Sequence, residues 1–147
     1  MGGDVAPAVP FDPRARASYR AWVQIPIRFS DQDLLGHVNN NAIGVYFEHA
    51  RCVHLLPPVR DSGVPGLDFV LARIVIDFVR EIRYPGTVDV GTRIGRVGNR
   101  SLTLLGATFL GETCCAVSEA TVVFFDTTTR RSTEPPQSIR AALAPLM

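Results

Sequence analysis

The sequence has almost no net charge and no long hydrophobic run, and both absences exclude classes of protein. Fifteen basic residues oppose fourteen acidic ones, which leaves a formal net charge of +1 at neutral pH. A broad electrostatic attraction to nucleic acid or to an anionic membrane is therefore not expected. No apolar stretch approaches the roughly 18 to 20 residues that cross a bilayer, and the N-terminus lacks the apolar core of a secretory signal. We expect a cytoplasmic protein that binds neither nucleic acid nor membrane.

Cysteine is scarce and lysine is absent. The three cysteines are an odd number, and two of them, Cys114 and Cys115, are adjacent. This is a poor disulfide framework without metal-ligand spacing, so we expect reduced thiols. All basic residues are arginines, whose guanidinium suits bidentate phosphate contacts, although genome composition alone can produce the same bias. With so little net charge, an anionic ligand would be held by a few local arginines.

The length predicts one domain. A chain of 147 residues buries roughly two thirds of its unfolded surface. Small residues and prolines dominate the first 17 residues, which predicts a disordered arm over 1–17 and a single domain over 18–147.

Periodicity predicts one strand, one long helix and four further strands. The first strand covers 19–29, and Pro26 places it at a sheet edge or a bulge. Apolar residues at three- and four-residue steps predict a helix over 40–54, ended by Pro57-Pro58. Alternating residues predict strands after Gly66 and over 86–97, 101–110 and 114–125, with a short helix after Pro135-Pro136 through Leu143.

This order predicts an α+β fold with a five-stranded antiparallel sheet, in which the last four strands form a meander. In the strand after Gly66, Val70, Ala72, Ile74, Ile76 and Phe78 are expected on one face. One helix covers only one face of such a sheet, so the other face and the edges need shelter. A second copy of the chain is the simplest shelter, and we expect a homo-oligomer with sites at the subunit boundary.

The polar stretch RFSDQDLLGHVNNNAIGVYFEHAR, residues 28–51, precedes the long helix. If the helix begins near Asn40, its free N–H groups can stabilise the oxyanion of an attacked carbonyl. Asp33 is close enough along the chain to supply a carboxylate as base or nucleophile. Two other readings remain open: a structural loop of caps and Asx-turns, or a metal site at the D-x-D pair.

The same stretch closely resembles the signature of hotdog-fold acyl-CoA thioesterases of the 4-hydroxybenzoyl-CoA thioesterase type. The shared features are an arginine-aromatic pair, D-x-D, G-H-V-N-N, and a helix that carries Y-F-E-x-A-R. The resemblance continues through ARIVIDFVREIRYPGTVDVGTRIGRVGNRSLTL and spans nearly the whole chain from Tyr19. It implies a hotdog fold: an antiparallel sheet wrapped around a central helix, with a short C-terminal helix.

The resemblance also implies catalytic roles by position. Asp33 falls where the family places its carboxylate, which either attacks the thioester or activates water. Asn40 falls where a backbone N–H polarises the thioester carbonyl. His37 and Asn39 are expected to fix the loop, and His37 has proton transfer as an alternative role. Asp31 is expected to cap or orient the loop.

Further residues are implied with competing structural roles. Glu48 matches a helix carboxylate used by a related branch, but an ion pair with Arg51 is the favoured reading. Arg100 and Ser101, and more weakly Arg83, fall near the nucleotide end of coenzyme A, or are simply surface residues. The candidates for lining the acyl group are core positions by default: Tyr46, Phe47, Ile74, Ile76 and Phe78.

The expected function is hydrolysis of an acyl-CoA or acyl-carrier-protein thioester by a homodimer or homotetramer. No metal or other cofactor is expected apart from the coenzyme A moiety of the substrate. Two alternatives remain: a non-catalytic acyl-thioester binding protein, and a hotdog hydratase or dehydratase.

Overall fold

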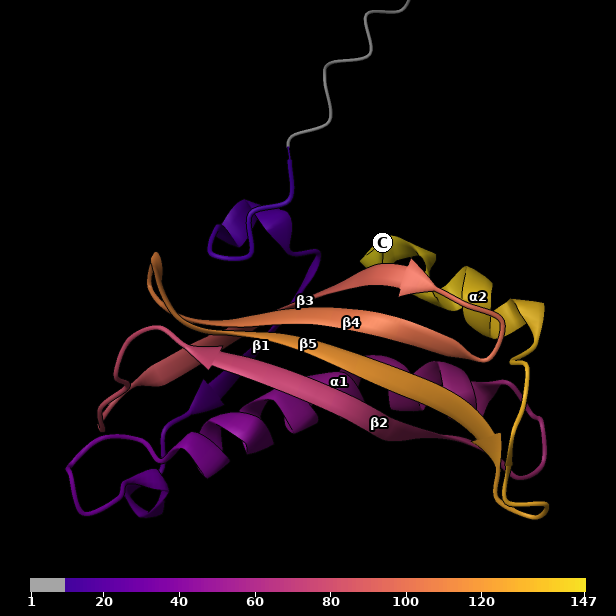
Figure 1. Cartoon of the computed structure of the whole chain (residues 1–147), viewed down its shortest axis with the longest axis horizontal. Coiled ribbons are helices and arrows are strands. Elements are labelled where there is room, and N and C mark those ends of the chain that lie inside the picture. The colour runs from indigo at the N-terminus through magenta and orange to yellow at the C-terminus, as the bar shows by residue number, and fades with distance from the viewer. Residues whose placement is uncertain (1–9) are drawn as a thin grey trace, which may run out of the picture.

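A curled antiparallel sheet wraps around one long helix in the computed structural model, which describes residues 10–147 (Figure 1). The strands are β1 (Ala21–Pro26), β2 (Leu67–Phe78), β3 (Thr87–Val97), β4 (Ser101–Leu110), β5 (Thr113–Asp126) and the two-residue β6 (Arg131–Ser132). The helices are α1 (Asn40–Asp61) and α2 (Gln137–Leu143), with 3-10 turns η1 (Arg16–Ser18), η2 (Phe29–Asp31) and η3 (Ala144–Leu146). The predicted α+β architecture is confirmed, and β1 ends at Pro26 on an edge of the sheet.

The strand order is β1-β3-β4-β5-β2, with β6 on β5, and all pairs are antiparallel. The predicted four-stranded meander is therefore wrong for β2, which pairs with β5 and not with β3. Residues 79–86 are longer than a tight hairpin loop and cross the end of the sheet instead. Ile82, at the middle of this crossing, is fully buried, and its carbonyl accepts the Val38 N–H at 2.7 Å.

A bulge changes which residues of β2 face the helix. The pairing shifts between Leu71 and Arg73, so Ala72 is the extra residue. Before the bulge Leu71 pairs with the buried Val122, and Val70 therefore faces outward. The expected common face from Val70 to Phe78 is wrong at its start, because an inserted residue inverts the alternation.

Helix α1 is longer than predicted because its second half packs in the core. The helix continues through Pro57 and Pro58 to Asp61. Leu55 and Val59 are buried in a cluster that also contains Ile139 and Leu143 of α2. This packing outweighs the missing N–H groups of the two prolines, which would end an isolated helix. The short C-terminal helix follows Pro136 as predicted.

The outer face of the sheet is partly covered by residues 10–20. Arg16 forms an ion pair with Asp89 at 3.0 Å, and its guanidinium lies 4.2 Å from the centre of the Trp22 ring. Tyr19 is buried against Phe109 in an outer cluster. Of the arm expected to be disordered, residues 1–9 lie outside the described residues, and Arg16 makes the contacts given above.

Candidate functional site

The loop before α1 folds as a small hairpin. It is hydrogen-bonded to residues 79–86, which cross the end of the sheet. Gln32 and Val38 form an antiparallel bridge, and the Asp33 N–H donates to the His37 carbonyl at 3.0 Å. Val38 is buried and tied to Ile82, as described above. The loop lies at one end of the sheet, directly in front of the helix (Figure 1). Its backbone is therefore fixed on both sides.

Asp31 is the buried anchor of this loop. It is only 4% exposed and accepts hydrogen bonds from the Tyr46 hydroxyl at 2.6 Å and from the Arg28 N–H at 2.9 Å, with the Arg28 guanidinium 2.9 Å away. Burial alone would raise the pKa of Asp31, but the hydrogen bonds from Tyr46 and Arg28 outweigh it, so the pKa lies below its usual value. Burial and the bond to Asp31 raise the pKa of Tyr46, which stays a donor. Asp31 is therefore an orienting residue, as expected.

Asp33, the second acid of the pair, has a different environment. Its side chain is half-buried, and one carboxylate oxygen accepts the Leu35 N–H at 2.9 Å in an Asx-turn. Within residues 10–147 its second oxygen has no hydrogen-bond partner. The carboxylate is thus held by one oxygen and free at the other.

The start of α1 leaves a backbone donor free. Asn39 is the N-cap, and its side chain accepts the Asn41 N–H at 2.8 Å. The Asn39 carbonyl accepts the Ile43 N–H. In the part of the chain that the structure describes, the Asn40 N–H donates to no acceptor. The helix begins where the sequence predicted, with an available N–H at its positive end.

Two further ionisable candidates lie nearby without a strong partner. His37 is half-buried, and its backbone carbonyl accepts the Asp33 N–H. Glu48 is 65% exposed and lies 4.0 Å from Arg51, so the expected ion pair is present but long. Neither side chain is placed by a hydrogen bond from residues 10–147 that would assign it a chemical role.

The predicted apolar lining is divided between core and surface. Tyr46 and Phe47 are buried, and Phe47 borders a cavity of about 20 Å³ between α1 and the sheet. Ile74 and Ile76 are half-buried on the inner face of β2, where Ile76 lies near Gly44 of the helix. Phe78, at the end of β2, is 47% exposed. The inner face of this edge strand is open in the single chain.

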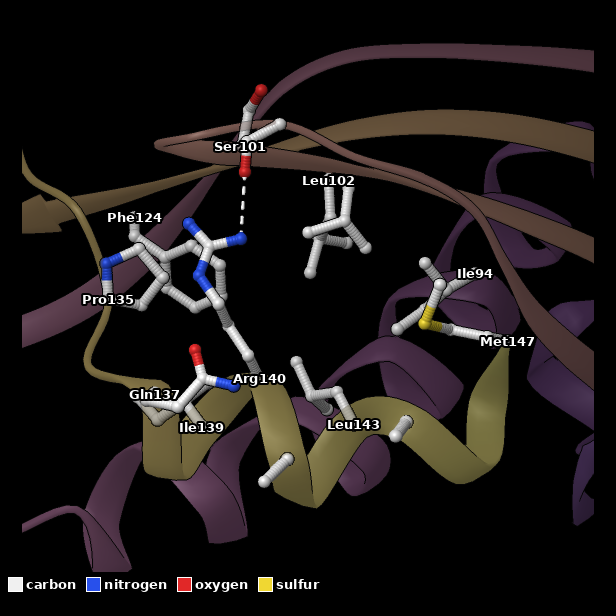
Figure 2. Close-up of a pocket in the computed structure, with 14 residues that line it drawn as sticks. Ile94, Ser101, Leu102, Phe124, Pro135, Gln137, Ile139, Arg140, Leu143 and Met147 are labelled. Atoms are coloured by element: carbon white, nitrogen blue, oxygen red, sulfur yellow. Dashed lines mark hydrogen bonds between the residues drawn. The ribbon is translucent and has the colours of Figure 1, made fainter.

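Arg100 and Ser101 lie at the β3–β4 turn, which is at the opposite end of the sheet from the loop before α1 (Figure 1). The ten residues of β4 separate the two ends, a distance of about 30 Å. Arg100 donates to the Ser132 hydroxyl of β6 at 3.3 Å. Ser101 lines an apolar cavity of about 300 Å³ between α2 and the sheet (Figure 2). Arg140 lines the same cavity and donates to the Gly98 and Asn99 carbonyls of the β3–β4 turn. Within one chain these residues do not join the loop.

Exposed apolar side chains surround the loop. Leu34 and Leu35 at its tip are 105% and 76% exposed. Phe29 is also exposed and packs edge-on against Tyr84, with ring centres 5.6 Å apart. Arg83, the weaker phosphate candidate, instead donates to the Gly36 carbonyl at 3.4 Å and to Glu81. The exposed apolar side chains of the loop and of the end of β2, namely Phe29, Leu34, Leu35 and Phe78, are here called the apolar rim.

The sequence analysis missed the burial of Arg51. Its side chain is 7% exposed and faces the sheet. A signal was present, because Arg51 continues the four-residue spacing of Ile43, Phe47 and Leu55, all of which are buried.

The remaining candidate groups are metal ligands, thiols and membrane-spanning helices. Residues 10–147 contain no group of three or more side chains placed to hold a metal ion. Cys114 and Cys115 are buried and free, and burial raises the pKa of both thiols, which keeps them protonated at neutral pH. No helix within this range has the length and apolar character needed to span a membrane.

Comparison with known proteins agrees with this architecture. Residues 27–143 match the family model of the thioesterase-like superfamily. The PA5185 protein from Pseudomonas aeruginosa is 27% identical with a TM-score of 0.81, over 90% of this chain and 95% of that one. A predicted thioesterase from Bacillus stearothermophilus is 30% identical with a TM-score of 0.79, over 86% and 95%. A thioesterase from Thermus thermophilus, complexed with coenzyme A and Zn, is 28% identical with a TM-score of 0.75, over 86% and 98%.

Proposed function

The chain belongs to the thioesterase-like superfamily and has the hotdog fold, and on this premise we propose that it hydrolyses a coenzyme A or carrier-protein thioester. The observation that carries the proposal is the pairing of a positioned carboxylate with an unused helix N–H. Asp33 keeps one carboxylate oxygen free, and the Asn40 N–H lacks an acceptor within residues 10–147.

The proposed chemistry divides between these two groups. The Asn40 N–H donates to the thioester oxygen, which becomes an oxyanion when the carbonyl carbon is attacked. Asp33 either attacks that carbon, which gives an anhydride that water then cleaves, or takes a proton from an attacking water. In both routes the C–S bond breaks, and the thiolate that leaves takes up a proton.

The surroundings support this division of roles. Asp31, Tyr46 and Arg28 fix the loop without using Asp33. The side chain of Asn39 takes the Asn41 N–H and leaves the Asn40 N–H available. His37 remains a candidate for orienting substrate or water from the same hairpin.

We also propose that the working site includes a second copy of the chain. The inner face of edge strand β2 and the apolar rim are exposed in the single chain. If β2 pairs antiparallel with its own copy, the two sheets run in opposite directions, and the far end of the partner sheet comes beside the loop. Arg100 and Ser101 of the partner subunit then become candidates for the phosphates of coenzyme A, which the Thermus neighbour binds.

The test is Asp33→Asn, assayed with a panel of acyl-CoA thioesters and a free-thiol readout. We expect kcat/KM to fall by at least about 100-fold because a positioned base contributes on the order of 10² or more. Asp61→Asn, at an exposed position at the end of α1, is the matched control and retains activity.

Three outcomes separate the candidate functions. Thiol release by the natural chain that is lost in Asp33→Asn supports the hydrolase. Water addition without thiol release identifies a hydratase, and affinity without turnover identifies a binding protein. Near-normal turnover by Asp33→Asn would show that Asp33 is not the catalytic carboxylate.

A further inference from the structure

A row of small and polar residues crosses the inner face of the sheet between its two apolar clusters. Thr92 of β3 pairs with Gly106 of β4, and Gly106 pairs with Ser118 of β5, so the three lie side by side. Residues of the first cluster, such as Val90 and Ala116, lie on one side of the row, and residues of the second, such as Ile94 and Ala120, lie on the other. This row of Thr92, Gly106 and Ser118 therefore separates the two apolar clusters under α1.

Arg51 of α1 lies over this row. Together with Thr92, Gly106 and Ser118 it lines the cavity of about 20 Å³ that Phe47 also borders. Its side chain is more than nine-tenths buried. Within residues 10–147 its guanidinium donates no hydrogen bond, and its one ion pair is the 4.0 Å approach to the exposed Glu48. A guanidinium stays charged in proteins, so a buried positive charge here lacks a close counter-charge.

Burying the Arg51 guanidinium without a close counter-charge lowers the stability of the fold unless a bound particle in the cavity compensates it. A buried charge is normally paired and hydrogen-bonded, because desolvation without compensation costs several kcal/mol or more. The polar side chains that line the cavity are one cation and two hydroxyls, and each of these can donate to an acceptor. The other lining side chains, Phe47, Leu104, Leu105 and Ala120, are apolar. Among residues 10–147 no carboxylate lines the cavity, so the guanidinium has no anionic partner there.

Gly106 keeps the cavity open. A Cβ at this position would lie 2.7 Å from the Ser118 hydroxyl and 3.1 Å from the Phe47 ring. Any larger residue would therefore crowd the Ser118 and Phe47 side chains that line the cavity. The volume is that of a single water-sized particle, which is too small for a carboxylate group or a phosphate.

We propose that Arg51, Thr92 and Ser118 form an internal binding site for a monatomic anion of the chloride class. The ion accepts hydrogen bonds from the guanidinium and from the two hydroxyls, and it neutralises the buried charge. Because it binds the folded chain and not the unfolded one, it stabilises the fold in proportion to the logarithm of its concentration above its Kd. The site is independent of thioester hydrolysis.

Thermal unfolding of the full chain at constant ionic strength tests the proposal. Sodium methanesulfonate, whose anion is too large for the cavity, is replaced stepwise by sodium chloride or sodium bromide. A tenfold excess of halide over its Kd is expected to raise Tm by about 3 to 5 °C for a chain of this size. Equal Tm values in methanesulfonate and in both halides would overturn the proposal.

Four variants and one control assign the effect to the cavity. Arg51→Met removes the charge, Thr92→Val and Ser118→Ala each remove one hydroxyl, and Gly106→Ala fills the space. We expect Arg51→Met and Gly106→Ala to abolish the halide shift and the hydroxyl variants to reduce it, whatever each does to Tm in methanesulfonate. Arg60→Met, at an exposed position of the same helix, keeps the full shift. If Arg51→Met fails to fold, the other three variants still decide.

Bromide-soaked crystals give a direct readout. An anomalous bromine peak within hydrogen-bond distance of the Arg51 guanidinium is expected. A water in the cavity, with bromide found elsewhere or not at all, would show that Arg51 is hydrated and that the anion site does not exist.

Discussion

At the scale of single residues, the D-x-D pair shows how environment divides two identical side chains. Asp31 is buried, bonded to Tyr46 and Arg28, and ionised by those bonds. Asp33 lies two residues later, half-buried, with one oxygen free. The first carboxylate is committed to holding the loop, so the second is the one available for chemistry.

Tyr46→Phe tests the structural half of this division. The variant loses a short hydrogen bond to a charged, buried acceptor, which typically contributes about 1.5 to 3 kcal/mol. We expect the free energy of unfolding at pH 7 to fall by about 2 kcal/mol, measured by urea denaturation. The variant also loses one of the hydrogen bonds that hold the loop in place. We therefore expect kcat to fall as well.

The loss in the free energy of unfolding caused by Tyr46→Phe becomes smaller at low pH. The folded-state pKa of Asp31 lies below its ordinary value of 3.8, so its contribution to stability is complete above that value and is lost as the pH falls through the folded pKa. The difference between variant and natural chain is therefore full at neutral pH and narrows below pH of about 4. A difference that stays constant down to pH 2 would contradict the role of the Tyr46–Asp31 bond.

At the scale of elements, the start of α1 combines a cap and a free donor. Asn40 occupies the first helical position, and Asn39 before it has φ −62° and ψ 143°. Proline is well tolerated at the first helical position and requires an extended residue before it. The backbone N–H can therefore be removed without disturbing the helix.

Asn40→Pro and Asn40→Ala separate the main chain from the side chain. We expect Asn40→Pro to lower kcat by about 100-fold or more, the usual effect of losing an oxyanion donor. Asn40→Ala keeps the N–H and should change kcat only a few-fold. Equal losses in the two variants, with unchanged circular dichroism, would count against the N–H as the oxyanion donor.

The second half of α1 tolerates two prolines because of what it packs against. Leu55 and Val59 are buried against α2, although Pro57 and Pro58 interrupt the hydrogen bonds of the helix. Pro57 is exposed, so Pro57→Ala should restore a hydrogen bond without changing the core. Proline inside a helix costs about 3 kcal/mol relative to alanine, and the more flexible unfolded chain returns part of that gain. We expect a net gain of about 2 kcal/mol in the free energy of unfolding, and a lower Tm would contradict this account.

At the scale of the whole molecule, the single chain leaves its candidate site open on one side. Leu34 and Leu35 are exposed at the tip of the loop, and Phe78 is exposed at the end of edge strand β2. Exposed apolar surface is typical of interaction sites, and an unpaired strand edge needs shelter. The proposed second copy would meet both requirements.

Leu34→Glu combined with Leu35→Glu tests the proposed subunit boundary. In an isolated chain such exposed changes have effects within about 0.5 kcal/mol, whereas at a buried interface the added charges oppose association. We expect sedimentation equilibrium to show a shift from dimer or tetramer toward monomer, with a parallel loss of turnover. Val64→Glu, also exposed but located after α1, is the control and keeps the assembly. An unchanged assembly in the double variant would exclude the loop tip from the interface.

Many of the helices and strands could be predicted from the sequence, because local residue patterns determine local structure. The helix start at Asn40, the edge strand at Pro26 and the later strands follow from periodicity and from proline and glycine positions. The pairing of β2 with β5, the bulge at Ala72 and the passage of α1 through two prolines were not predicted. Each depends on contacts between segments far apart in the sequence, which outweigh local preference.

The sequence by itself determined the order of elements and the candidate residues of the site, because side-chain periodicity and helix capping depend on residues that are close together in the chain. Only the tertiary structure decided what each of those residues is free to do. Folding committed Asp31 to Tyr46, left Asp33 and the Asn40 N–H available, placed Arg100 at the far end of the sheet and buried Arg51 over a polar row. Hydrogen-bond partners and burial are properties of three-dimensional neighbours, and no linear pattern fixes them.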